Sequence, residues 1–177
     1  MGISERLPGW QKIAPVYAVI VLIVYGWSLL WYLWTFPSWL KFLTVSEILL
    51  TFSFVLATNL LESLLVLAPI VAISLLMPMR WFRDVFVARG AALAIAGLGS
   101  MMLLALQFRD IDDYPADLST WLPAAVAVML IVAVVAGRLP FLRKGLEAFA
   151  ERATVLLLIS IPLSVLALIT SAVQVFL

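Results

Sequence analysis

A glutamate in the middle of a long apolar stretch is the residue of this chain best suited to chemistry inside a membrane. Glu62 lies within residues 48–76, with Asn59 one helical turn before it and Ser63 beside it. Thr58 precedes it by four residues, so both fall on one helix face. An ionised carboxylate at the bilayer centre costs at least about 2.5–3.5 kcal/mol. We therefore expect Glu62 to be protonated, hydrogen-bonded or in contact with water.

Serines on the last apolar stretch provide a matching polar face. Ser160 and Ser164 are four residues apart, and Ser164 falls at a depth comparable to that of Glu62 if the two helices run in opposite directions. Such side chains hydrogen bond across pairs of transmembrane helices. The sequence therefore predicts an intramembrane polar site that consists of Glu62, Asn59, Thr58, Ser63, Ser160 and Ser164.

Two functions fit this polar site. In the first, a protonated Glu62 hydrogen bonds to another helix or meets a partner, and the protein is a subunit or accessory scaffold within a membrane assembly. In the second, Glu62 handles protons or cations in a channel or transporter. The first is favoured because Glu62 has no evident basic partner in the sequence.

The acidic loop Asp110–Asp117 is a weaker candidate for chemistry. Its carboxylates suit calcium or magnesium, but the loop lacks the glycine turn and terminal glutamate of an EF-hand, so a solvated loop is expected and no metal site. The chain has no cysteine and no histidine. This excludes thiol nucleophiles, Ser-His triads, Cys or His zinc sites and histidine-ligated haem. No cofactor is expected, and an embedded enzyme that uses this loop is the least favoured function.

Apolar helices must position these residues. The chain is 66% hydrophobic and 12% charged, whereas charged residues make up about a quarter of an average soluble domain. Its apolar stretches are long enough to cross a hydrocarbon core of about 30 Å. The sequence predicts an all-α membrane protein, a five-helix bundle that forms a single transmembrane domain over residues 1–177. The predicted spans are 14–36, 48–76, 90–106, 121–137 and 153–177.

Basic residues are distributed unequally between the two sides of this bundle. All but two of the 11 Lys and Arg residues fall on the side shared by the N-terminus and the second and fourth loops, and the exceptions are Lys41 and Arg109. The positive-inside rule therefore predicts a multi-pass protein of the cell (plasma) membrane, with a cytoplasmic N-terminus and an external C-terminus. The alternating charged and apolar residues of 138–152 predict a short amphipathic segment at the interface.

The expected partners are the lipid bilayer and another protein or a second copy of the chain. The basic pairs Arg80 with Arg83 and Arg143 with Lys144 are candidates for lipid headgroup contacts, although the positive-inside bias also accounts for them. Small residues from Gly90 onward favour close helix packing. A net charge of +1 gives no reason to expect nucleic acid.

The end of the first predicted span is rich in aromatic residues. Trp31–Tyr32, followed by Pro37–Trp39, resembles the first loop of the tryptophan-rich sensory (translocator) proteins, which also have five spans. Leu40–Lys41 stands where that family has prolines, and nothing later in the chain matches, so tetrapyrrole binding is not transferred. Trp27, Trp31 and Trp34 are expected to anchor or pack the helix instead of forming a ligand cage.

Overall fold

The described residues fold entirely into helices. The computed structural model describes residues 8–76, 84–107 and 118–176. Its elements are α2 (Trp10–Trp39), α3 (Val45–Leu76), α5 (Phe86–Gln107), α6 (Leu118–Arg138), α7 (Pro140–Ala153), the 3-10 turn η1 (Thr154–Leu156) and α8 (Leu157–Phe176). Within these residues, five stretches are long and apolar enough to cross a membrane, with α7, η1 and α8 counted as one. The predicted all-helical class is confirmed.

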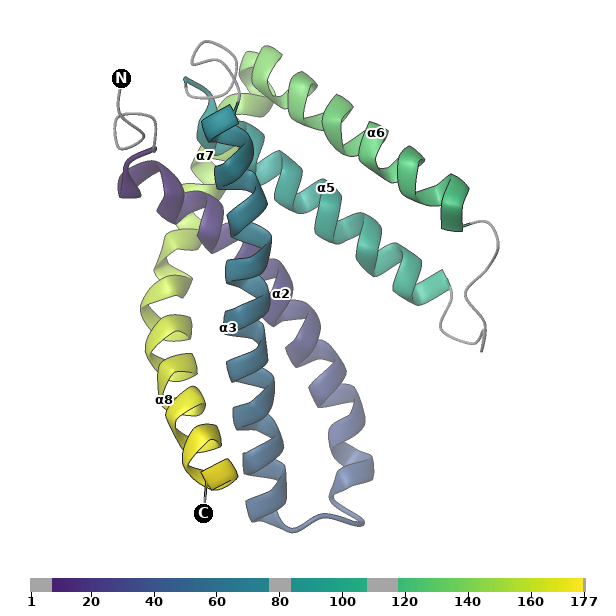
Figure 1. Cartoon of the computed structure of the whole chain (residues 1–177), viewed down its shortest axis with the longest axis vertical. Coiled ribbons are helices and arrows are strands. Elements are labelled where there is room, and N and C mark those ends of the chain that lie inside the picture. Colours follow the sequence, from purple (N-terminus) through teal and green to yellow (C-terminus); the bar gives the residue numbers. More distant parts are fainter. Residues whose placement is uncertain (1–7, 77–83, 108–117, 177) are drawn as a thin grey trace.

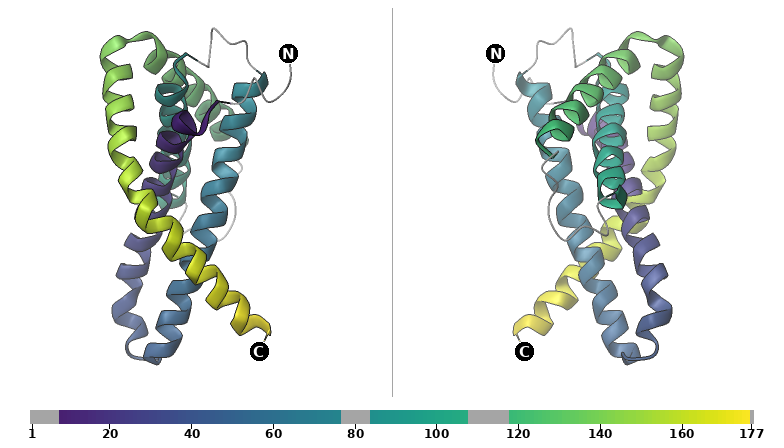
Figure 2. Two further views of the ribbon diagram at one scale, coloured as in Figure 1. Left: turned by 90° about the vertical axis from the view of Figure 1, so that its left-hand side faces the viewer. Right: turned by 90° about the vertical axis from the view of Figure 1, so that its right-hand side faces the viewer.

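The charged segment before the last helix differs from the predicted one. The pattern at 138–152 predicts a separate interfacial segment, but α7 runs through η1 directly into α8 (Figure 2). No glycine or proline occurs between residues 146 and 161, so no helix-breaking residue stands where α7 meets α8. Ala150 and Ala153 are buried, and α7 packs against α2 and α5. This packing holds α7 against the bundle, and the chain changes direction where α7 continues into α8 (Figure 2).

The first half of α2 forms the centre of the bundle. Val16, Ala18, Val19 and Ile20 are all 0% exposed, and α2 contacts α3, α5 and α7. The helices run up and down, so that α2 begins at one end of the molecule and α8 finishes at the other (Figure 1). The core therefore lies nearer to the end at which α2 begins.

A glycine allows α5 to approach α2 closely. A Cβ atom added at Gly90 would lie 2.9 Å from one methyl carbon of Val16 and 3.0 Å from the other. Ala91, Ala92 and Ala94 are also buried along α5. Inside lipid, apolar burial gives little driving force for helix association. Small residues matter there because they let helix backbones approach closely.

A short turn joins α2 to α3 and is fixed by a reciprocal cap. The Thr44 backbone N–H donates to Oε2 of Glu47 at 2.7 Å, and the Glu47 backbone N–H donates to Oγ1 of Thr44 at 3.4 Å. This capping box satisfies donors that the first turn of a helix leaves free. The hairpin of α2 and α3 extends beyond α5 and α6 (Figure 1). Its far half is therefore covered on fewer sides than the core.

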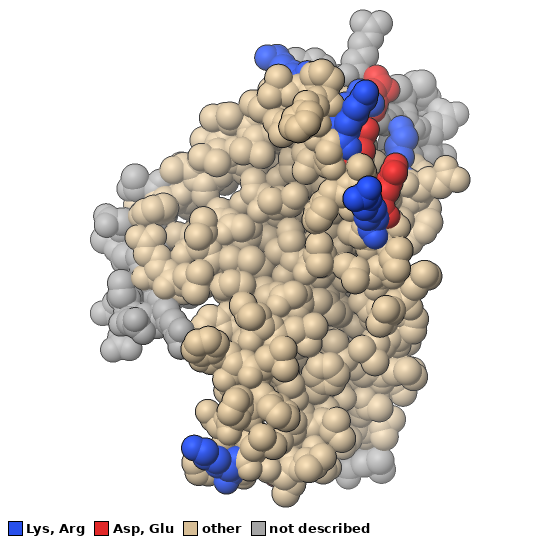
Figure 3. All heavy atoms as spheres, turned by 180° about the vertical axis from the view of Figure 1, so that it is seen from behind, with Lys and Arg blue, Asp and Glu red and all other residues tan. Residues whose placement is uncertain are grey.

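Charged side chains are concentrated toward one end of the molecule. Of the described basic residues, Lys41 alone lies at the turn between α2 and α3, and the others belong to the start of α2 or α5, the end of α6, or α7. On the face shown in Figure 3, a broad region without charged side chains separates the two charged ends. This distribution suits a bilayer, because the middle of each helix meets hydrocarbon while its ends meet headgroups.

Candidate functional site

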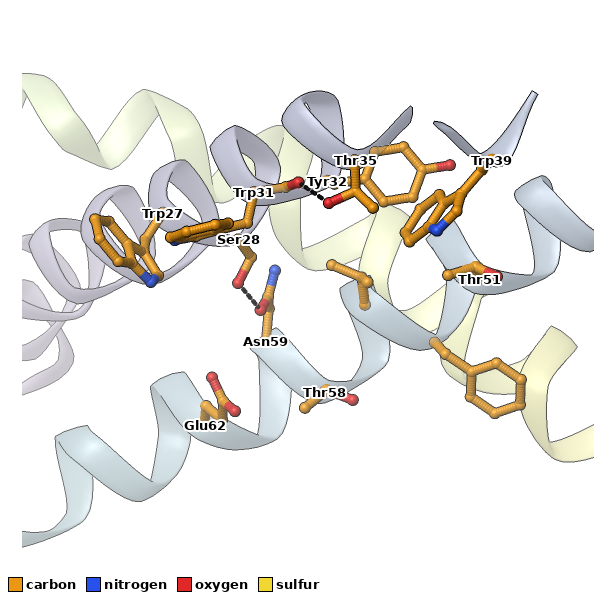
Figure 4. A pocket seen from close by; sticks show the side chains of 12 residues that line it. Trp27, Ser28, Trp31, Tyr32, Thr35, Trp39, Thr51, Thr58, Asn59 and Glu62 are labelled. Atoms are coloured by element: carbon orange, nitrogen blue, oxygen red, sulfur yellow. Dashed lines mark hydrogen bonds between the residues drawn. The ribbon is translucent and has the colours of Figure 1, made fainter. Parts of the chain in front are cut away.

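An open groove lies between the far halves of α2 and α3. It has a volume of about 470 Å³ and is lined by Trp27, Ser28, Trp31, Tyr32, Thr35 and Trp39 of α2 and by Thr51, Phe54, Val55, Thr58, Asn59 and Glu62 of α3. Aromatic rings form much of one wall, while the other carries an amide, a carboxyl group and hydroxyls (Figure 4). The groove therefore combines apolar contact with hydrogen-bonding groups.

Asn59 is the most buried polar residue of the groove, with 2% exposure. Its Oδ1 accepts a hydrogen bond of 2.7 Å from the Ser28 hydroxyl, which links α3 to α2. Its Nδ2 is buried and has no hydrogen-bond partner. A buried amide left unpaired costs about 1–3 kcal/mol. Asn59 therefore keeps an unused donor buried in the wall of the groove.

Glu62 stands beside Asn59 and is exposed. It lies 17 positions after Val45, the first residue of a 32-residue helix, so it is near the middle of α3. Its side chain projects toward the side on which Trp27 and Trp31 lie (Figure 4). Thr58 is exposed as well and lines the same groove. Three of the six residues predicted from the sequence, Glu62, Asn59 and Thr58, thus line this groove.

The remaining predicted site residues lie elsewhere. Ser63 is fully buried, and its Oγ lies 3.1 Å from the Tyr17 hydroxyl oxygen. Ser164 is also fully buried and hydrogen bonds to the Tyr25 hydroxyl at 2.7 Å. The expected meeting of Glu62 with Ser164 is therefore wrong, because Ser164 turns to α2 while Glu62 faces the groove.

Ser160 has a purely local partner. Its hydroxyl donates to the Leu156 carbonyl oxygen, four residues earlier, at 2.8 Å. Serine hydroxyls in helices often bond in this way when no neighbouring helix offers a better partner. Ser160 therefore does not join the groove.

The sequence-based site missed the contribution of α2. Tyr25, Ser28, Tyr32 and Thr35 recur at offsets of three, four and three, which is a helical stripe of polar groups. Tyr25 and Ser28 bond to α8 and α3, and the Tyr32 hydroxyl donates to the Ile48 carbonyl oxygen at 3.1 Å. The spacing of these residues was the available signal. It identifies α2 as the helix that provides hydrogen-bond partners for the polar groups of its neighbours.

The tryptophans of α2 divide between two environments. Trp27 and Trp31 pack edge to face with ring centroids 5.9 Å apart and line the groove. Trp34 is 74% exposed and does not line the groove. Of the three rings expected to anchor or pack the helix, two therefore contact the groove and the third is exposed beyond it.

Removing the Tyr25 hydroxyl tests the buried link between α2 and α8. Tyr25→Phe is expected to lower the free energy of unfolding by about 0.6 kcal/mol and by no more than about 1.7 kcal/mol, the range found for hydrogen bonds between transmembrane helices. The measurement is unfolding in mixed micelles titrated with a denaturing detergent. In a double-mutant cycle with Ser164→Ala, the coupling energy between the two positions should equal most of the stability lost in Tyr25→Phe. A coupling energy of zero would contradict the 2.7 Å hydrogen bond.

The predicted lipid contacts are described only in part. Arg143 of α7 forms an ion pair with Glu147, with Nε 2.9 Å from Oε1, and Lys144 is exposed. Arg80, Arg83 and the loop Asp110–Asp117 lie outside the described residues. Within the described ranges, no group of three or more acidic side chains is placed to hold a metal ion.

The described residues form an all-helical protein with five long apolar helices and an open, largely aromatic groove that carries a few polar groups. Comparisons with family models, with curated proteins and with solved structures give no significant match, so no family is assigned. The case for a function therefore depends on what the groove residues can do chemically.

Proposed function

We propose that this protein is a subunit or accessory scaffold of an assembly in the cell membrane, and that its groove receives side chains from a transmembrane helix of a partner protein. The observation that carries the proposal is the exposure of Glu62 near the middle of α3. The accompanying topology is a single transmembrane domain with a cytoplasmic N-terminus and an external C-terminus, supported by the basic residues near the start of α2 and in α7.

An exposed glutamate at this depth is unstable in contact with lipid alone. Transferring an ionised side chain to the bilayer centre costs at least about 2.5–3.5 kcal/mol. The neighbouring Nδ2 of Asn59 is unpaired as well. Both costs are offset if a partner supplies a cation to Glu62 and an acceptor to Asn59. Intramembrane carboxylates usually pair in this way or face an aqueous cavity.

Charge complementarity indicates the chemistry of the partner. A lysine or arginine on the partner helix would pair with Glu62, and its apolar stem would lie against Trp27 and Trp31. A second copy of the chain is a poorer fit, because the described basic residues are at helix ends and two-fold pairing would place one Glu62 against another. The partner is therefore a different chain with a basic residue at mid-membrane depth.

The size of the groove defines how the partner docks. One turn of a helix about 10 Å wide occupies roughly 400 Å³, which is close to the groove volume of about 470 Å³. A whole transmembrane helix is too long to fit. The partner helix would instead lie along the opening and insert two or three side chains between α2 and α3.

A peptide assay tests this proposal directly. The probe is a leucine-rich transmembrane peptide with one central lysine, and its control is the same peptide with leucine at that position. Energy transfer in phosphatidylcholine vesicles should report binding of the lysine peptide to the protein, and Glu62→Gln should weaken it at least tenfold, because removing one member of a buried charge pair costs about 2–5 kcal/mol. Glu47→Gln is the matched control, since glutamine retains the cap.

Equal binding of both peptides, or unchanged binding to Glu62→Gln, would contradict the proposal. Self-association is tested separately. The chain has no cysteine, so Thr58→Cys introduces a single thiol at the groove. Efficient disulfide cross-linking between two copies through this thiol would show that the groove is a homodimer interface and would overturn the heteromeric reading.

A channel or transporter is the second candidate, and it is favoured by the groove that reaches Glu62 from outside. In that case Glu62 binds a proton or cation, and the Asn59 amide positions the carboxyl group. The discriminating measurement is ion and proton flux in liposomes. Flux that disappears in Glu62→Gln would support transport and overturn the scaffold proposal, whereas its absence in the unmodified protein would exclude transport.

A further inference from the structure

The side chain of Arg89 packs directly on the backbone of a neighbouring helix. Arg89 is near the start of α5, and its guanidinium group covers Gly137, close to the end of α6. A Cβ atom added at Gly137 would lie 2.7 Å from Nη2 and 2.8 Å from Cζ of Arg89. Only glycine leaves this space open. The absence of a side chain at position 137 therefore fixes where the guanidinium group lies.

Among the residues that the structure describes, this guanidinium group has no counter-charge. Its Nε is buried without a hydrogen-bond partner. Arg138 directly follows Gly137, and its charge repels that of Arg89. Neither arginine has an acidic partner among the described residues. Arg89 is half-buried and Arg138 is exposed, so two positive charges act on each other at this end of the molecule, which is unfavourable unless an anion binds them.

The acidic residues of the adjoining elements do not supply that anion. Glu147 of α7 is already paired with Arg143, whose Nε is 2.9 Å away. Glu151 and Asp84 are exposed. The helix α7 packs against both α5 and α6, but its ion pair is internal to the helix.

We propose that Arg89 and Arg138 bind the phosphate group of an anionic lipid headgroup. Guanidinium groups match phosphate oxygens with two parallel hydrogen bonds, and Arg is preferred over Lys for this geometry. Both residues are at helix ends, and the start of α5 and the end of α6 both lie in the upper part of Figure 1. Basic pockets between transmembrane helices bind lipid headgroups in this position. The proposal does not depend on the function assigned to the groove.

The test measures binding of single lipids to the purified protein by native mass spectrometry. The probe is phosphatidylglycerol, with phosphatidylcholine as the zwitterionic comparison. The unmodified protein should retain phosphatidylglycerol preferentially. Arg89→Gln and Arg138→Gln should each weaken that binding about fivefold, the effect of about 1 kcal/mol for each basic residue near the headgroups.

The Gly137→Ala variant tests whether lipid binding depends on the position of the Arg89 guanidinium group or only on its charge. The added methyl group displaces the flexible end of Arg89 without removing a positive charge, and alanine is compatible with the helix. It should therefore weaken phosphatidylglycerol binding about as much as Arg89→Gln. Lys144→Gln is the control for nonspecific attraction, because Lys144 is basic, exposed and on the adjoining helix, and it should change binding less than twofold.

Two outcomes would overturn the proposal. If Lys144→Gln weakens binding as much as Arg89→Gln while Gly137→Ala has no effect, the attraction comes from overall charge and no built site exists. If inorganic phosphate competes with phosphatidylglycerol at equal concentration, the arginines bind free phosphate and the lipid assignment is wrong. Circular dichroism of each variant, compared with the unmodified protein, verifies that the helices are intact.

Discussion

Gly90→Leu is expected to prevent α5 from packing on α2 and to leave little folded protein. Even Gly90→Ala places a Cβ atom 2.9 Å and 3.0 Å from the two methyl carbons of Val16. Val16 is 0% exposed, and valine has one strongly preferred rotamer in a helix, so it cannot turn away. We expect Gly90→Ala to lower the free energy of unfolding by about 1–3 kcal/mol, the usual effect of overpacking.

The matched control is Gly99→Ala on the same helix. A Cβ atom there meets nothing within 4 Å, so the substitution should be neutral or should stabilise the helix by up to about 1 kcal/mol, the difference in propensity between glycine and alanine. Unfolding in mixed micelles, followed by circular dichroism, measures both variants. Equal stability of Gly90→Ala and Gly99→Ala would show that α5 and α2 are farther apart than described.

Phe86→Ala is expected to have the largest effect of any truncation in the core. Phe86 is 1% exposed and is the largest of the fully buried side chains. Replacing a buried phenylalanine by alanine costs about 3–5 kcal/mol, part of which is the cavity left behind. Lipid is as apolar as the core, so lost packing accounts for most of the effect here. The value should therefore fall near about 3 kcal/mol.

Phe141→Ala provides the comparison for Phe86→Ala. Phe141 is 86% exposed, so its truncation leaves no cavity and should change the free energy of unfolding by less than about 0.5 kcal/mol. Thermal unfolding of both variants in the same detergent gives the difference. A small effect of Phe86→Ala would mean that α5 begins outside the core, contrary to its burial.

The two ends of the bundle are built differently, and this difference creates the groove. Near the start of α2, small residues such as Gly90 draw the helices together around Val16. In the far half, α2 and α3 extend past α5 and α6 (Figure 1), and the rings of Trp27 and Trp31 line the groove between them. A tightly packed base thus supports a hairpin that is covered on fewer sides.

Much of the fold could be predicted because the apolar content of a stretch depends only on its own residues and not on what they pack against. Five long apolar stretches define the helices in any arrangement, and each of α2, α3, α5 and α6 contains the span predicted for its part of the chain. The polar trio of Glu62, Asn59 and Thr58 was also identifiable, since helical spacing places these side chains close together before any packing is known.

The partners of those polar groups could not be predicted in the same way. Ser164 was matched to Glu62 by depth alone, yet it bonds to Tyr25, because depth does not specify which way a helix is rotated. A rotation of one helix by a third of a turn changes every neighbour of its side chains without altering the sequence pattern.

The sequence by itself therefore determined the helical class, the approximate helix boundaries and the presence of an acidic residue within an apolar helix. Only the tertiary structure decided that Glu62 faces an open groove, that α7 continues into α8, and that the Arg89 guanidinium rests on Gly137. The physical reason is that transfer free energies depend on composition along the chain, whereas rotation and close approach depend on the shapes of side chains that meet from distant positions.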